Sequence, residues 1–164
     1  MSNSGINYVV GDATKPIGDG VKFIVHVCND IGGWGRGFVM AISKRWAEPE
    51  RQYRNWHSGK AEQPFALGEV QLVQVESDIF VANLIGQHDI RSAKGVPPIR
   101  YDAIRRGLAS IAAEAKRMGA SLHMPRIGCG LAGGNWKEIE KIIREEVVDR
   151  GIKVVVYDLS NTGP

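Results

Sequence analysis

The sequence predicts an α/β fold, a three-layer α/β/α domain with a mixed central sheet. Apolar strand-like runs alternate along the chain with amphipathic helical patterns, which is typical of parallel sheets covered by helices. Two β-rich runs, residues 69–75 and 79–85, are separated only by three polar residues, so an antiparallel hairpin interrupts this alternation. The length of 164 residues corresponds to one domain, with a core over about residues 6–159 and short disordered ends.

The first half of the chain contains two predicted strands and two predicted helices. Residues 6–10 form a short strand, and the nearly all-apolar residues 22–28 form a strand that is buried on both faces. A helical pattern follows Gly37 and is expected to end near Ala47, because Pro49 disfavours a helical residue before it. Pro49 suits the first turn of a second helix, which continues over residues 50–57.

The second half follows the predicted hairpin. Residues 87–100 are polar and basic and contain one glycine and two prolines, so we expect a surface loop. A long amphipathic helix begins at Tyr101 and ends at Gly119. A strand over residues 121–127 leads to a helix that Asn135 caps, and the apolar residues 152–157 form the last strand.

Two glycine-rich loops, residues 29–37 and 124–134, each follow a predicted strand and precede a predicted helix. Glycine lets the backbone turn sharply and approach a ligand closely, and such a loop offers several N–H groups to one anion. One such loop is equally consistent with a tight turn. Two of them in one domain indicate the two sides of a site for a phosphorylated ligand. Neither contains the motif of a nucleoside triphosphate loop or the dinucleotide-binding fingerprint.

The composition limits the kinds of ligand and partner that the protein is expected to have. The net charge of +3 suits an anionic ligand but gives no support for nucleic-acid binding, because no run of Lys and Arg marks one face. Cys28 and Cys129 form no Cys-x-x-Cys pair and have no zinc-ligand spacing, so we expect neither a metal nor a cofactor. With two thiols, no signal peptide and no apolar run of membrane-spanning length, the chain is expected to be cytoplasmic, monomeric and not bound to membranes.

Three segments together resemble the macrodomain family, over roughly residues 6–159. They are Gly11-Asp12-Ala13-Thr14 after the first strand, the loop of residues 29–37, and Pro125-Arg126-Ile127-Gly128-Cys129-Gly130-Leu131. The last segment is most similar to the branch that contains the terminal ADP-ribose protein glycohydrolases and related bacterial proteins. The first loop departs from the more common family pattern, Asn-Ala-Ala-Asn followed by Gly-Gly-Gly.

The resemblance implies that the ligand is ADP-ribose or an ADP-ribosylated protein. Asp12 would accept a hydrogen bond from the adenine amino group, the Ala13 N–H would contact the same ring, and Asn29 would lie near the distal ribose. The other implied contacts to the diphosphate, the distal ribose and the adenine are Gly35, Gly37, Phe38, Ile127, Gly128, Cys129, Gly130, Leu131 and Tyr157. The residues alone also allow Asp12 to cap a turn, Asn29 to bind loop backbone, and Tyr157 to belong to the core.

The implied chemistry is hydrolysis. In the similar branch a lysine forms an adduct with the distal ribose and an aspartate lies in the second loop. Gln87 and Ala132 occupy those positions here, so we do not expect that mechanism. We expect a bound water to attack, with Asp30, His88 and Asp89 as candidates for proton transfer.

Three functions follow from the resemblance. The first is removal of mono-ADP-ribose from Glu and Asp side chains of proteins, by hydrolysis of the ester. The second is dephosphorylation of ADP-ribose 1″-phosphate, and the third is binding of ADP-ribose without chemistry.

Overall fold

The computed structural model describes residues 5–160. Those residues form, in chain order, β1 (Ile6–Val10), β2 (Lys22–Asn29), α1 (Phe38–Arg45), α2 (Glu48–His57), β3 (Val70–Glu76), β4 (Ile79–Gln87), α3 (Tyr101–Met118), β5 (Ser121–Met124), α4 (Trp136–Glu146), the 3₁₀-helix η1 (Val148–Arg150) and β6 (Val154–Asp158). The disorder expected at the two ends concerns mainly residues 1–4 and 161–164, which lie outside the described residues.

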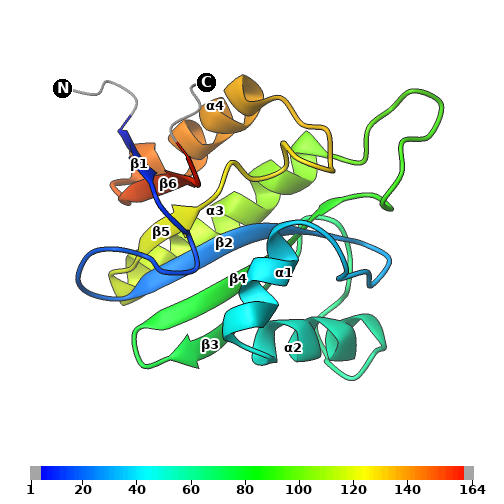
Figure 1. Ribbon diagram of the computed structural model, residues 1–164, viewed down its shortest axis with the longest axis horizontal. Coiled ribbons are helices and arrows are strands. Elements are labelled where there is room, and N and C mark those ends of the chain that lie inside the picture. Colours follow the sequence, from blue (N-terminus) through cyan, green and yellow to red (C-terminus); the bar gives the residue numbers. More distant parts are fainter. Residues whose placement is uncertain (1–4, 161–164) are drawn as a thin grey trace.

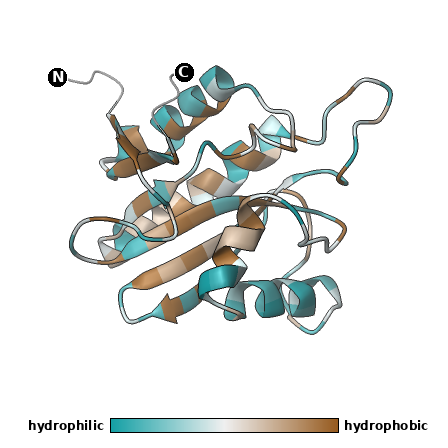
Figure 2. Cartoon of the chain, viewed as in Figure 1, coloured by the Kyte–Doolittle hydropathy of each residue, from teal (hydrophilic) through white to brown (hydrophobic). Residues whose placement is uncertain are grey.

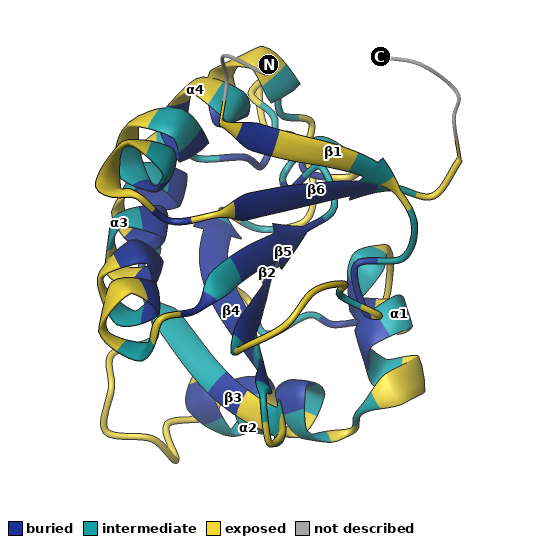
Figure 3. Cartoon of the chain, turned by 90° about the vertical axis from the view of Figure 1, so that its left-hand side faces the viewer, coloured by how far each residue is buried: buried dark blue, intermediate teal, exposed yellow. Residues whose placement is uncertain are grey.

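The strands form one mixed sheet in the order β1-β6-β5-β2-β4-β3. All neighbours in this sheet are parallel except β3 and β4, which pair as the predicted antiparallel hairpin. Helices α3 and α4 cover one face of the sheet, and α1 and α2 cover the other (Figures 1 and 3). The predicted three-layer α/β/α fold with a mixed sheet is therefore confirmed.

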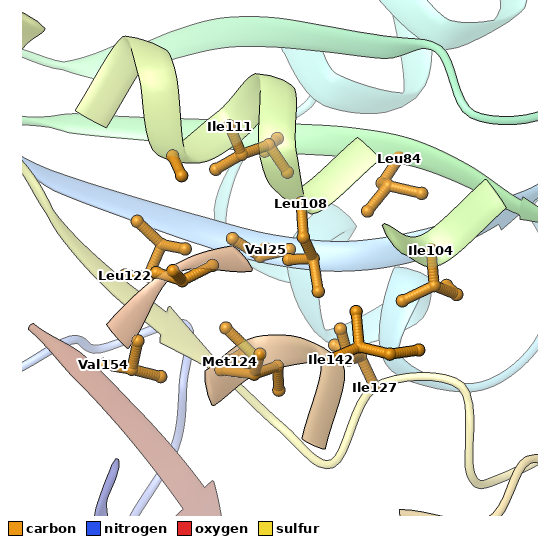
Figure 4. Packing of buried hydrophobic residues seen from close by; sticks show 14 of the residues in the cluster. Val25, Leu84, Ile104, Leu108, Ile111, Leu122, Met124, Ile127, Ile142 and Val154 are labelled. Carbon is orange, nitrogen blue, oxygen red and sulfur yellow. The ribbon is translucent and has the colours of Figure 1, made fainter. Parts of the chain in front are cut away.

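Two apolar clusters hold the layers together. The larger one packs Leu84 and Leu122 of the sheet against Ile104 and Leu108 of α3 and Ile142 of α4 (Figure 4). The second lies under α1 and α2. The middle strands are hydrophobic, whereas the outer surfaces of the helices are hydrophilic (Figure 2). Burial of apolar side chains on both faces explains why β2 reads as a continuous apolar run.

Several element boundaries differ from those predicted: β2, β3, β4 and β6 are shifted by one or two residues at one end or both, and three further differences have a clear cause. The strand expected over residues 121–127 is too long: β5 ends at Met124, because Pro125 has no N–H to donate to a neighbouring strand. Helix α1 ends at Arg45, since Trp46 is already extended, with φ −143° and ψ 133°. Helix α2 begins at Glu48, so Pro49 lies in its first turn.

The segment predicted as a surface loop has partial order. Beyond Gln87 it contains no helix or strand, but isolated bridges join Gln87 to Ile99 and Ala93 to Val96. It projects from the body of the molecule beyond β4 and α3 (Figure 1). Within residues 5–160, no helix has the length and apolar character needed to cross a lipid bilayer.

Candidate ligand cavity between the glycine loops

A cavity of about 540 Å³ lies at the carboxyl ends of β2, β4 and β5. Because parallel strands place their carboxyl ends at one edge of the sheet, the two glycine-rich loops meet there. The cavity is lined by residues of both loops, among them Arg126, and by His26, Gln87 and Ile90. A Cβ atom built on Gly37 would lie 3.7 Å from Leu131 Cδ1, so the loops approach each other closely.

Asn29 organises the first loop. Its Nδ2 donates to Gly33 O at 2.9 Å, and its Oδ1 accepts from the N–H groups of Ile31 and Gly33 at 3.0 and 2.9 Å. From α2, the hydroxyl of Tyr53 lies 2.6 Å from Asn29 O and 2.9 Å from Oδ1. The side chain of Asn29 therefore holds the loop in shape at the cavity wall, and Tyr53 fixes that side chain.

Helix α1 begins at the cavity without a cap. Its N-cap residue is Gly37, which offers no side-chain acceptor, and φ of 83° there is a conformation that favours glycine. Among residues 5–160, no hydrogen bond uses the N–H groups of Gly35, Gly37 or Phe38. By contrast, α4 is capped by Asn135, whose side chain accepts from the N–H groups of Lys137 and Glu138. The α1 N-terminus thus presents free donors and a positive dipole end to the cavity.

The second loop faces α1 from the other side. Its shape is fixed by a 2.7 Å hydrogen bond from Gly134 N to Gly128 O. A Cβ atom on Gly134 would lie 2.5 Å from that carbonyl oxygen, which explains the glycine. Within the described chain, the N–H groups of Gly130 and Leu131 donate to no acceptor. Two sets of free amides therefore lie on opposite sides of one cavity, an arrangement suited to an extended anion.

His26 forms part of the cavity floor. The amide of Asn83 donates to Pro49 O at 3.2 Å and to Gln71 Oε1 at 3.0 Å, so its Oδ1 is left to accept from His26 Nε2 at 2.5 Å. Burial lowers the pKa of His26 to about 4, so the imidazole is neutral. The place of His26 beside the cavity depends on the long-range contact with β4, and the sequence did not predict it.

Arg126 is a second lining residue with no predicted role. Its guanidinium makes a bidentate ion pair with Asp158 at 2.9 and 3.0 Å. It also lies 5.2 Å from the ring centroid of Tyr8 and 5.4 Å from that of Trp136. Hydrogen bonding to Arg126 lowers the pKa of Asp158. These contacts hold a cation at the cavity wall. The sequence contains no local signal for them, because they join the second loop to β1, α4 and β6.

The three candidates for proton transfer lie together at the rim. Asp30 Oδ2 is 2.7 Å from His88 Nδ1, and Asp30 Oδ1 accepts from Asp89 N at 2.8 Å. Partial burial tends to raise the pKa of Asp30, but the hydrogen bonds from Asp89 and His88 outweigh it, so the pKa is lowered. Ionised Asp30 directs the Nδ1 proton of His88 toward itself and leaves Nε2 as an acceptor. The three side chains adjoin the lining residues Asn29, Gln87 and Ile90 but do not line the cavity themselves.

The residues expected at the adenine lie beside the cavity. Asp12 Oδ1 accepts from the N–H and the hydroxyl of Thr14 at 2.9 and 2.7 Å, so Asp12 does cap a turn. Tyr157 packs with Ala13 in a buried cluster that Phe38 contacts. The Tyr157 hydroxyl accepts from Ile17 N at 2.9 Å and lies 2.6 Å from His123 Nδ1. Contact of Asp12, Ala13 and Tyr157 with a ligand stays a prediction.

The predicted binding residues thus divide into two groups. The cavity lining includes Asn29, Gly35, Gly37, Phe38, Ile127, Gly128, Gly130 and Leu131. It does not include Asp12, Ala13, Cys129 or Tyr157. The Cys129 thiol turns away to Ile127 O at 3.5 Å, and burial raises its pKa, so it is not an activated thiolate. Gln87 and Ala132, at the positions of the glycohydrolase lysine and aspartate, both line the cavity.

The fold and the site define an α/β protein with a cavity, suited to an anion, between two strand-to-helix loops. No profile of a known protein family matches the sequence. The structure is similar to that of a protein of unknown function from Bacteroides thetaiotaomicron, with 57% identity, a TM-score of 0.90 and coverage of 94% of this chain and 98% of that chain. It is also similar to a macrodomain protein from Streptomyces coelicolor, with 53% identity, a TM-score of 0.82 and coverage of 93% and 98%. The chain therefore belongs to the macrodomain family.

Curated relatives include the mouse chromodomain-helicase-DNA-binding protein 1-like, which is 36% identical over 166 residues. That match covers 96% of this chain but 18% of the relative, so the chain spans less than a fifth of that protein. An ADP-ribose 1″-phosphate phosphatase from Lodderomyces elongisporus is 22% identical over 150 residues, covering 84% of this chain and 90% of that protein. The bovine ADP-ribose glycohydrolase OARD1 is 35% identical over 60 residues, 36% of this chain and 40% of that protein.

Proposed function

We propose that this macrodomain binds ADP-ribose in the cavity and hydrolyses the ester that joins ADP-ribose to Glu or Asp side chains of proteins. The observation that carries the proposal is the uncapped N-terminus of α1 facing the free amides of the second loop. A diphosphate between them would accept hydrogen bonds from both sides, and the α1 dipole would favour its charge. Two relatives named for ADP-ribose chemistry support the same ligand.

The reaction needs a water activated near the anomeric carbon of the distal ribose. In the proposed mechanism His88 Nε2 takes a proton from that water while Asp30 holds the imidazole by its Nδ1–H. The water oxygen then bonds to the anomeric carbon, and the ester oxygen leaves as the carboxylate of the protein side chain. Amides around the diphosphate hold the ribose in place during the attack. Gln87 has no amine to form an adduct, so no covalent intermediate is proposed.

The test is release of ADP-ribose from a protein modified on Glu and Asp. His88→Gln and Asp30→Asn are expected to slow release by about 100-fold, the usual contribution of one proton-transfer group, while ADP-ribose binding is retained. Asp19→Asn, at an exposed position between β1 and β2 and outside the cavity lining, is the matched control and should release ADP-ribose at the parent rate. Unchanged rates in both rim variants would remove the Asp30–His88 pair from the mechanism.

Two alternative functions remain, and each predicts a different result. Tight binding without release would select a protein that reads ADP-ribose, which the replacement of the lysine and aspartate by Gln87 and Ala132 favours. Release of inorganic phosphate from ADP-ribose 1″-phosphate would select a phosphatase, as the name of the Lodderomyces elongisporus relative suggests.

A further inference from the structure

Residues 88–99, which we name the rim hairpin, form a preorganised arm beside the cavity. His88 N donates to Pro98 O at 2.8 Å and Ile99 N donates to Ala132 O at 3.0 Å, which ties its base to the second loop. At its tip, Ala93 and Val96 exchange two backbone hydrogen bonds of 3.0 and 2.9 Å. Lys94 and Gly95 between them have φ of 53° and 78°, as in the tight turns that close two-residue hairpins.

The rim hairpin exposes apolar side chains that no part of the described chain covers. Ile90 and Val96 are each 52% exposed, and Leu131 of the second loop is 57% exposed. Ile90 and Leu131 also line the cavity. These exposed aliphatic side chains offer an apolar surface to an occupant of the cavity that extends past its rim.

The same surface carries cations without counter-ions. Arg91 and Lys94 on the rim hairpin and Arg36 in the first loop are exposed. Within residues 5–160 none of the three takes part in an ion pair, whereas all six arginines of α2, α3 and α4 do. The rim also carries two carboxylates, and both are already engaged: Asp30 by His88 and by Asp89 N, and Asp89 by Ile90 N. Three cations against these two carboxylates leave an excess of positive charge. The rim is therefore apolar and positive.

We propose that the rim hairpin docks the polypeptide segment that carries the ADP-ribose, and that it selects segments in which acidic and apolar residues flank the modified side chain. This inference rests on the proposed function and names its substrate class. Arg91 and Lys94 complement acidic flanks, and Ile90 and Val96 contact an apolar side chain. Aliphatic side chains give no stacking surface for bases, which favours a polypeptide over an ADP-ribose polymer or a nucleic acid.

The probes are two peptides that carry ADP-ribose on a glutamine amide, a linkage that ester hydrolysis does not cleave. One has Glu and Leu in its flanks, and the other has Lys in place of each Glu. The parent is expected to bind the acidic peptide about tenfold more tightly than free ADP-ribose, and the basic peptide no more tightly than ADP-ribose. Arg91→Glu combined with Lys94→Glu should remove the preference and leave affinity for free ADP-ribose within about twofold.

Lys116→Glu combined with Lys141→Glu, exposed on α3 and α4, changes the net charge equally and should keep the preference. Equal affinity of the parent for both peptides overturns the inference while ADP-ribose binding leaves the proposed function standing. Failure to bind ADP-ribose overturns both. Loss of affinity for an ADP-ribose polymer in the rim variant, with the acidic peptide bound as before, overturns the inference in favour of a polyanion.

Discussion

Asn29 illustrates how single side chains work at this cavity. It was expected near the distal ribose, and it does line the cavity, but its oxygen accepts from two loop N–H groups and lies within reach of the Tyr53 hydroxyl. Its first role is to shape the loop whose amides face the ligand. The hydrogen bonds of Asn29 to loop backbone could be predicted, because Asn side chains often bind nearby backbone groups in loops. The contribution of Tyr53 could not, because it comes from a helix packed below.

Two buried histidines make the folded state sensitive to acid. Burial lowers the pKa of His26 to about 4, and burial together with Lys22 and Lys153 lowers the pKa of His123 to about 4. A histidine takes up its proton near pH 6.5 once unfolded, so the unfolded state binds more protons between pH 6.5 and pH 4. Stability is therefore expected to be full above pH 6.5 and to fall toward pH 4.

Urea denaturation at pH 7 and pH 5 measures this effect. Each histidine is expected to account for about 2 kcal/mol of the loss between the two pH values. His26→Gln and His123→Gln should each lower that difference, whatever their effect at pH 7. A parent-sized difference in both variants would contradict the account of the two imidazoles.

Gly37 is the residue on which the anion site most depends. Its φ of 83° is unfavourable for any residue with a Cβ atom, and its N–H is a free donor at the cavity. Gly37→Ala is expected to cost about 1–2 kcal/mol of stability and at least about tenfold in ADP-ribose affinity. Gly20→Ala is the matched control, because Gly20 has φ of 80°, open surroundings and no place in the cavity lining. It should lose similar stability and no affinity, so equal affinity losses would contradict the role of Gly37.

At the scale of elements, the N-termini of α1 and α4 differ in one informative way. Both helices follow a glycine-rich loop, but α4 has Asn135 as its own cap, whereas α1 begins at Gly37 with no side-chain acceptor. Helices α2 and α3 also begin without a side-chain cap, so the missing cap is informative only together with its place at the cavity. The open end of α1 is the one that faces the cavity, which is why we assign the ligand to it.

Removal of the α4 cap should affect stability alone. Asn135→Ala leaves the N–H groups of Lys137 and Glu138 without their acceptor and is expected to cost about 1 kcal/mol. Thermal unfolding measures the loss, and Asn135→Asp, which keeps an oxygen acceptor, should restore most of it. A large loss of ADP-ribose affinity in Asn135→Ala would show that α4 takes part in binding.

Element boundaries show what a sequence can and cannot convey. The hairpin of β3 and β4 and the long helix α3 follow from local patterns, and both are present. Strand β5 ends three residues early at Pro125, which a stricter use of the proline rule would have predicted. The ordered tip of the rim hairpin depends on a left-handed Lys94, for which residue type gives almost no signal.

At the scale of the whole molecule, the sheet brings the separate parts of the site together. The loops after β2 and β5 are about a hundred residues apart in the chain, yet parallel pairing brings both to one edge of the sheet. This explains why motifs predicted the glycine loops, whereas Arg126 with its partner Asp158 and His26 with its partner Asn83 needed the folded structure. Contacts between distant strands produce no recognisable pattern in the sequence of either segment alone.

The central claim is that ADP-ribose occupies this edge of the sheet, with its adenine at Asp12. Calorimetric titration of ADP-ribose into the parent, Asp12→Ala and the exposed control Asp19→Ala tests it most directly. We expect one ADP-ribose to bind per chain in the parent and in Asp19→Ala, and Asp12→Ala to bind at least about tenfold more weakly, the effect of losing a hydrogen bond to a charged group. Absence of binding to the parent would contradict the claim for the cavity as a whole, and parent-like affinity in Asp12→Ala would contradict the placement of the adenine.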